Sequence, residues 1–222
     1  MITGARGLIG GILMRALRDD FDVAGVDRRP SRRRGIRRAD VSRLDRAARA
    51  VRGADVIVHL AANPSTDASW TDVQRNNIPA AVSVLEAARL EGVARVVLAS
   101  SNHVVGMYER DEPYASIVAG RYGGLTAEAA ARFYADEYGL STISLRIGTV
   151  NRAGRPTQPR HFATLLTHRD LAQLVRCAVT AAPELRNSVY FGVSGNTWRI
   201  WDLTDAESAL GYRPEDDAEA WR

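Results

Sequence analysis

Short apolar runs alternate along the chain with stretches in which apolar residues recur at helical spacing. The apolar runs predict strands, and the periodic stretches predict helices that each bury one face. The expected strands cover the end of a first strand at residues 1–3, then residues 22–27, 54–62, 94–101 and 142–147. The expected helices follow the first strand, follow residues 40–41, cover about 70–91 and 125–138, and end with a last helix that begins near residue 168. This alternation predicts an α/β fold with a parallel sheet and helices on both faces.

The first expected strand, which is short in this sequence, runs into a glycine-rich turn, Thr3 to Gly10, that opens directly onto a helix. Glycines at positions 4, 7 and 10 permit positive φ, close approach of a pyrophosphate and tight packing of the helix on the sheet. The next expected strand ends at Asp27, where a carboxylate can bind the hydroxyls of an adenosine ribose. The pattern therefore predicts a Rossmann-type doubly wound sheet that binds a dinucleotide.

An arginine-rich run, residues 28–38, follows Asp27 and holds seven arginines and no acid. The formal net charge of the chain is +4, so the remainder of the chain is net acidic and the basic character is local. A broad nucleic-acid-binding face is therefore not expected, and a solvated loop is the simpler interpretation. A second interpretation places Arg28 or Arg29 against the 2′-phosphate of NADP. Asp27 would repel that phosphate, which favours NAD.

The length of 222 residues and the 45% hydrophobic content suit one domain with a substantial core. The apolar runs are too short to span a membrane, and no leader pattern precedes the glycine turn, so a cytoplasmic protein is expected. The single cysteine, Cys177, lies in a helical pattern and is interpreted as a buried thiol; no metal is expected. All 30 basic side chains are arginine, because the sequence contains no lysine.

Besides the glycine turn and Asp27, further positions fit one family pattern, and they are 40–41, 59–62, Asn77, 100–106, 146–148, Arg160, His168, 193–196, 201–202 and the tail 210–214. Through these positions the chain resembles the extended short-chain dehydrogenase/reductase and sugar epimerase superfamily, and within it the uronate dehydrogenases. The resemblance covers nearly the whole chain. It implies NAD as cofactor, a substrate-binding portion from about residue 149 onward, and a homodimer built from the helices near 70–91 and 125–138. The implied cofactor-binding residues are Gly4, Arg6, Gly7, Leu8, Ile9, Gly10, Asp27, Arg28, Asp40, Val41, Leu60, Ala61, Ala62, Asn77 and Ile147.

The resemblance also implies oxidation of a uronic acid or related sugar at its anomeric carbon. Ser101 matches the family serine that binds the reacting oxygen, and Tyr122 is the candidate for the tyrosine base. In this family a lysine four residues beyond the tyrosine stabilises the tyrosinate, since a free phenol is a poor base at neutral pH. The implied substrate-binding residues are Ser65, Ser101, Asn102, His103, Thr149 and Arg160.

The tyrosine–lysine pair is the part of the family pattern that this chain does not match. Thr126 stands four residues beyond Tyr122, and an alignment without gaps places Gly120 and Gly124 at the two positions. Three interpretations therefore stay open. They are an NAD-dependent dehydrogenase of uronic acids or similar sugars, whether or not the broken pair impairs it, a redox-neutral epimerase or isomerase with bound NAD, and a non-catalytic dinucleotide-binding sensor or scaffold.

Overall fold

A parallel β-sheet forms the centre of the protein. The structure, a computed structural model, describes residues 1–65, 68–105 and 124–222. Within these residues seven strands pair in the order β3-β2-β1-β4-β5-β6-β7, all parallel. The strands are β1 (Ile2–Thr3), β2 (Gly25–Asp27), β3 (Ile36–Arg38), β4 (Val56–His59), β5 (Arg95–Ser101), β6 (Ser141–Ile147) and β7 (Asn187–Gly192). The strand order reverses between β1 and β4, where such sheets bind ligands at the carboxyl ends of the strands.

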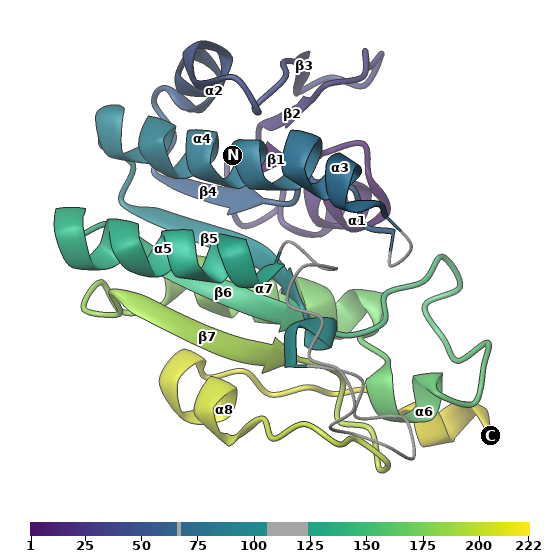
Figure 1. Ribbon diagram of the computed structural model, residues 1–222. Helices are drawn as coiled ribbons and strands as arrows, with labels where there is room; N and C mark the ends of the chain where they lie inside the picture. The colour runs from purple at the N-terminus through teal and green to yellow at the C-terminus, as the bar shows by residue number, and fades with distance from the viewer. Residues whose placement is uncertain (66–67, 106–123) are drawn as a thin grey trace.

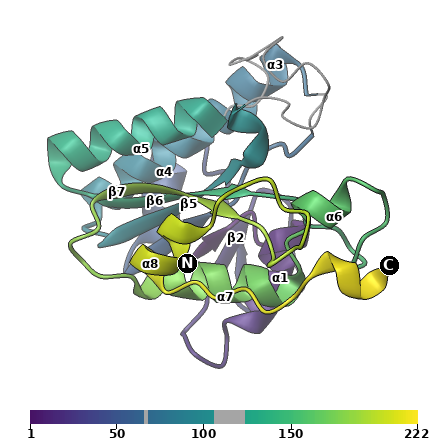
Figure 2. The ribbon, with the colours of Figure 1, turned by 90° about the horizontal axis from the view of Figure 1, so that it is seen from below.

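Helices cover both faces of the sheet, as the alternating pattern predicts (Figure 1). On one face lie α2 (Leu44–Val51), α4 (Ile78–Leu90) and α5 (Gly124–Tyr138), and on the other lie α1 (Leu8–Ala16) and α7 (His168–Thr180), as Figure 2 shows from below. The shorter elements are α3 (Trp70–Asp72), a π-helical turn (Val73–Asn77), α6 (His161–Thr164), α8 (Thr204–Leu210) and 3-10 turns at Asn102–Val105 and Ala218–Trp221. The expected doubly wound fold is confirmed.

The sheet separates two apolar cores, and β5 contributes to both of them. Val96 and Leu98 pack under α2, α4 and α5, whereas Val97 packs toward α1 and α7. Because successive side chains of a strand point to opposite faces, a strand that is covered on both sides reads as a continuous apolar run. This explains why residues 94–101 were recognisable as a buried strand.

Two strands and the last helix differ from the sequence expectation. β3 lies inside the arginine-rich run, where only Ile36 is buried, so this edge strand carries too little apolar signal to be distinguished from a loop. β7 was not predicted, and α8 follows α7, so the helix that begins at His168 is not the last one. Cys177 lies in α7 as expected; it is half-buried, and burial raises the pKa of its thiol.

In the described part of the chain, no helix combines the length and the apolar character needed to cross a membrane.

Candidate active site

The glycine turn between β1 and α1 lies at the carboxyl end of the central strand. Gly4 has φ +67°, and a Cβ there would lie 2.8 Å from the carbonyl oxygen of Leu60. A Cβ on Gly10 would lie 2.4 Å from the carbonyl oxygen of Gly4, so only glycine lets α1 pack this closely. The first turn of α1 has no side-chain cap and no acidic residue, which leaves its dipole available to an anion. These features fit the pyrophosphate of a dinucleotide.

The Thr3 hydroxyl ties the end of β1 to the end of β4. Its Oγ1 accepts hydrogen bonds from the amides of Leu60 and Ala61 at 3.1 and 3.2 Å and lies 2.8 Å from Nδ1 of His59. With both acceptor positions used, the hydroxyl donates to Nδ1, so the ring proton of neutral His59 belongs on Nε2. Burial lowers the pKa of His59 to about 4, which keeps the ring neutral. Sequence reasoning missed both residues as parts of the site.

Asp27 ends β2 with its carboxylate buried against the glycine turn. One oxygen accepts from the amide of Arg6 at 3.0 Å, and the other accepts from the amide of Arg29 at 2.9 Å and its Nε at 3.3 Å. Burial alone would raise the pKa of Asp27, but these donors lower it overall. The carboxylate therefore stays charged and retains acceptor capacity for ribose hydroxyls.

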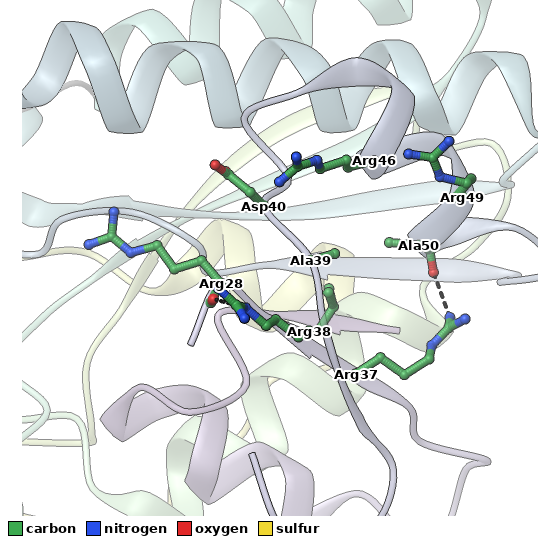
Figure 3. Close-up of a pocket in the computed structure, with 9 residues that line it drawn as sticks. Arg28, Arg37, Arg38, Ala39, Asp40, Arg46, Arg49 and Ala50 are labelled. Atoms are coloured by element: carbon green, nitrogen blue, oxygen red, sulfur yellow. Dashed lines mark hydrogen bonds between the residues drawn. The ribbon is translucent and has the colours of Figure 1, made fainter. Parts of the chain in front are cut away.

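Asp40, Val41 and Arg28 are three further residues expected to bind the cofactor. Arg28 and Asp40 line a pocket of about 510 Å³ between β2, β3 and α2 (Figure 3). Oδ1 of Asp40 accepts from Oγ of Ser42 at 2.7 Å and from its amide at 3.1 Å, which lowers the pKa of the carboxyl group. Val41 is buried in the core under α2 and α4. Arg28 is exposed and donates from Nη1 to Oδ1 of Asn76 at 3.1 Å.

Asn77 holds the loop that follows β4. Its side chain accepts from the amide of Asn63 at 2.7 Å and donates to the Asn63 carbonyl at 3.1 Å. Asn77 ends the π-helical turn, a distortion that is frequent at functional sites. The loop carries Leu60, Ala61 and Ala62, and further along Ser65, whose amide donates to Oδ1 of Asn63 at 3.1 Å. Asn63, like Thr3 and His59, is a residue of this region that sequence reasoning missed.

Ser101 is the last residue of β5 and stands beside Ile147, the last residue of β6, in the parallel register. Its Oγ accepts from the amide of His103 at 3.2 Å and lies 3.4 Å from Oδ1 of Asn102, to which it donates. Asn102 is buried, and His103 is half-buried in the 3-10 turn. The strand ends thus bring Ser101, Asn102 and His103 to the same edge as the glycine turn.

Thr149 and Arg160 are joined through Thr164 of α6. The hydroxyls of Thr149 and Thr164 lie 2.8 Å apart, and the Thr164 hydroxyl donates to the carbonyl of Arg160 at 3.1 Å. α6 lies beyond the carboxyl ends of β5 and β6 (Figure 1). Two of the expected substrate-binding residues, Thr149 and Arg160, are therefore held together by α6, through the buried Thr164 that sequence reasoning missed.

A charged network packs α5 against the ends of β5 and β6. Glu128 of α5 is buried and accepts from Ser100 Oγ at 2.5 Å and from Nε and Nη2 of Arg146 at 3.0 and 2.8 Å. The Arg146 guanidinium also lies 5.4 Å from the ring centroid of Phe191. Because Arg146 is committed to this bidentate pair, its guanidinium is already neutralised by Glu128.

Tyr122 and Gly120 lie outside the described residues, so the structure does not place the expected base. Thr126 stands in the first turn of α5 and is exposed. Its exposure leaves room for a longer side chain at that position.

The two-sided parallel sheet, the glycine turn under α1 and the acid at the end of β2 define a Rossmann-type dinucleotide-binding protein. The profile of the NAD dependent epimerase/dehydratase family matches residues 1–201, and the chain belongs to this family. The expectations of NAD as cofactor and of an NAD-dependent enzyme of the dehydrogenase and epimerase type are confirmed at this level.

Individual relatives include sugar dehydrogenases. The chain is 33% identical to a uronate dehydrogenase of Pseudomonas syringae over all of this chain and 83% of that protein. It is 34% identical to L-arabinose 1-dehydrogenase (NAD(P)(+)) of Haloferax volcanii over 98% of this chain and 96% of that protein. A crystal structure of a uronate dehydrogenase mutant from Agrobacterium tumefaciens complexed with NAD superposes with a TM-score of 0.89 at 30% identity, covering 100% of this chain and 86% of the other.

Proposed function

We propose that this protein oxidises a uronic acid or a related sugar at its anomeric carbon with NAD as the cofactor. One observation supports this proposal above the others. The glycine turn, Ser101 at the end of β5 and the hydrogen-bonded group of Thr149, Thr164 and Arg160 all lie at the same edge of the sheet. The similarity to uronate and L-arabinose dehydrogenases supports the same substrate class.

Each residue has a distinct task in this proposal. The cofactor, when bound, takes up the hydride released from the anomeric carbon. The amides at the start of α1 bind its pyrophosphate, and Asp27 accepts from its ribose hydroxyls. Ser101 donates a hydrogen bond to the reacting oxygen, and Tyr122 removes the proton of the anomeric hydroxyl. Arg160 holds the substrate carboxylate by two parallel hydrogen bonds.

The absence of lysine leads to the second part of the proposal, that catalysis is slow at neutral pH. An unassisted phenol has a pKa of about 10, so each pH unit below that leaves about tenfold less tyrosinate. Because lysine is absent, two alternative functions remain open. They are a redox-neutral sugar epimerase and a non-catalytic dinucleotide-binding protein. Conversion between sugar isomers without net nicotinamide reduction would favour the epimerase.

The proposed activity is tested by following nicotinamide reduction with glucuronate, and with glucose as the matched substrate that lacks the carboxylate. Arg160→Ala should raise KM for glucuronate by about tenfold or more, because a charge-assisted pair is lost, and should leave KM for glucose nearly unchanged. Arg155→Ala, an exposed arginine of the same loop, is the control. Equal effects on both sugars would contradict the carboxylate-binding role of Arg160.

The base is tested in the same assay. Tyr122→Phe should lower kcat by about a hundredfold or more, and the wild-type rate should rise about tenfold per pH unit above neutrality. Thr126→Lys should raise the rate near neutral pH if the gapped alignment is right. Full activity of Tyr122→Phe at neutral pH would remove the tyrosine from the mechanism.

The proposal also includes a homodimer, substrate binding by the portion from about residue 149 onward, and a location in the cytoplasm. α6 and the Thr149–Thr164 contact support the substrate-binding portion. The location stays a prediction from composition.

A further inference from the structure

The loop between β6 and α6, residues 148–160, carries Thr149 and leads directly into α6 through Arg160. Beyond Thr149 this loop belongs to no strand or helix, and its sequence is rich in glycine, proline and arginine. A segment of this kind has few backbone hydrogen bonds that could fix its course. The course of the loop therefore depends on side chains that hold it from outside.

Two imidazole rings hold this loop. Nε2 of His168, at the start of α7, donates to the carbonyl of Asn151 at 2.8 Å. Nδ1 of His161, the first residue of α6, accepts from the amide of Thr157 at 3.1 Å. His168 thus fixes the beginning of the loop, and His161 fixes the part that comes just before Arg160.

The ring of His161 suits this contact because it is buried and neutral. Burial lowers the pKa of His161, and the charge of the neighbouring Arg160 lowers it further. The unprotonated Nδ1 therefore stays available as an acceptor. The Thr157 hydroxyl at 3.3 Å and Nδ2 of Asn151 at 3.4 Å approach the same nitrogen.

His161 and Thr164 hold the backbone of Arg160 from two sides. The contact between Thr157 and His161 closes a short ring of chain that contains Arg160. Within this ring the amide of His161 donates to the carbonyl of Gln158 at 3.0 Å. On the other side the Thr164 hydroxyl donates to the carbonyl of Arg160 at 3.1 Å. The two contacts together set the position from which the Arg160 side chain extends.

This position matters because a guanidinium forms two parallel hydrogen bonds with a carboxylate only when the two planar groups meet in one orientation. We propose that His161 is a positioning residue, which holds Arg160 in place for the carboxylate of a uronic acid by accepting from the Thr157 amide. The inference rests on the proposed function of Arg160, and it adds a residue that was not among the expected site residues.

Calorimetry of glucuronate binding to the NADH-saturated protein tests the inference, because the reduced cofactor prevents oxidation during the measurement. His161→Leu removes the acceptor for the Thr157 amide and should weaken glucuronate binding about tenfold. His161→Asn keeps an acceptor oxygen near the position of Nδ1, so its affinity should stay within about threefold of wild type. In the oxidation assay, His161→Leu should raise KM for glucuronate and leave kcat, and KM for glucose, unchanged.

A double variant separates positioning from a general loss of structure. In the Arg160→Ala background, His161→Leu should cause no further loss of glucuronate affinity, because the group that it positions is gone. The inference is overturned if His161→Leu binds glucuronate like the wild type, if His161→Asn binds no better than His161→Leu, or if the double variant binds more weakly than Arg160→Ala.

Two other results separate the inference from the proposed function. Glucuronate binding that depends on His161 and Arg160, without any oxidation by NAD, would contradict the proposed activity alone. Glucuronate binding that does not depend on Arg160 would contradict the proposed role of this arginine and the inference with it.

Discussion

At the residue scale, the Thr3–His59 pair is a buried hydrogen bond that should make stability depend on pH. Burial lowers the pKa of His59 from 6.5 to about 4, so the unfolded chain binds more protons between these values. Unfolding should therefore become easier as the pH falls from about 6.5 toward 4, by about 2–3 kcal/mol from this one group. Urea unfolding near pH 7 and near pH 4.5 measures the change.

His59→Asn supplies the comparison, because it removes the titrating ring and keeps an acceptor for the Thr3 hydroxyl. Between the two pH values, the free energy of unfolding of the variant is expected to fall by about 2–3 kcal/mol less than that of the wild type. An identical loss in both proteins would show that His59 is not the group responsible. Other titrating groups contribute equally to both proteins and cancel in the difference.

At the scale of elements, the sequence predicted which residues stand at the strand ends. It did not predict the side-chain contacts between different helices and strands. The Gly4–Gly10 turn, Asp27 and Ser101 each follow an apolar run, so their meeting at one edge follows from a parallel sheet. The Glu128–Arg146 pair gave no such signal, because its partners lie on α5 and β6 and meet only through tertiary packing. β3 was missed for a related reason, since an edge strand among exposed arginines shows almost no apolar pattern.

Arg95 is another contact between elements that sequence could not reveal, and it carries a stability prediction. Its buried guanidinium donates to the carbonyls of Ala181 and Ala182 at 2.6 and 2.7 Å, just beyond α7, and Nε donates to Ser141 Oγ at 2.8 Å. Arg95→Met would remove all of these hydrogen bonds at once and leave the half-buried carbonyl of Ala181 and the buried Ser141 hydroxyl without this donor. We expect a loss of roughly 3–5 kcal/mol in the free energy of unfolding.

Denaturant unfolding of Arg95→Met, with Arg95→Lys beside it, measures this contribution. Lysine keeps the charge but has fewer donors and no planar fork, so its loss should be intermediate. Arg52→Met, which breaks an exposed pair with Glu91, should leave the midpoint nearly unchanged. A wild-type midpoint in Arg95→Met would show that water or the backbone satisfies the carbonyls instead.

At the scale of the whole molecule, α4 and α5 leave an apolar surface uncovered. Val84, Leu85 and Ala88 of α4 are fully buried, so that part of the helix serves the core of the subunit. The neighbouring side chains on the outer face remain exposed, and they are Val82 and Leu90 of α4 and Phe133 and Tyr138 of α5. Exposed apolar side chains on two adjacent helices suit an interface with a second copy of the chain.

Phe133 is the residue with which to test this dimer. Its side chain is 54% exposed, and its ring packs edge-on against Tyr134 and Tyr138 at 5.6 and 5.8 Å between centroids. Phe133→Glu would place a charge at the centre of a two-fold interface, where it would meet its own symmetry mate, and should give a monomer by sedimentation at micromolar concentration. Ile200→Glu is the control, at a similarly exposed apolar position away from α4 and α5, and this variant should still sediment with the mass of a dimer. A monomeric wild type would exclude the dimer. A dimer that survives Phe133→Glu would exclude this surface as the interface, since a buried unpaired charge at its centre could not be tolerated.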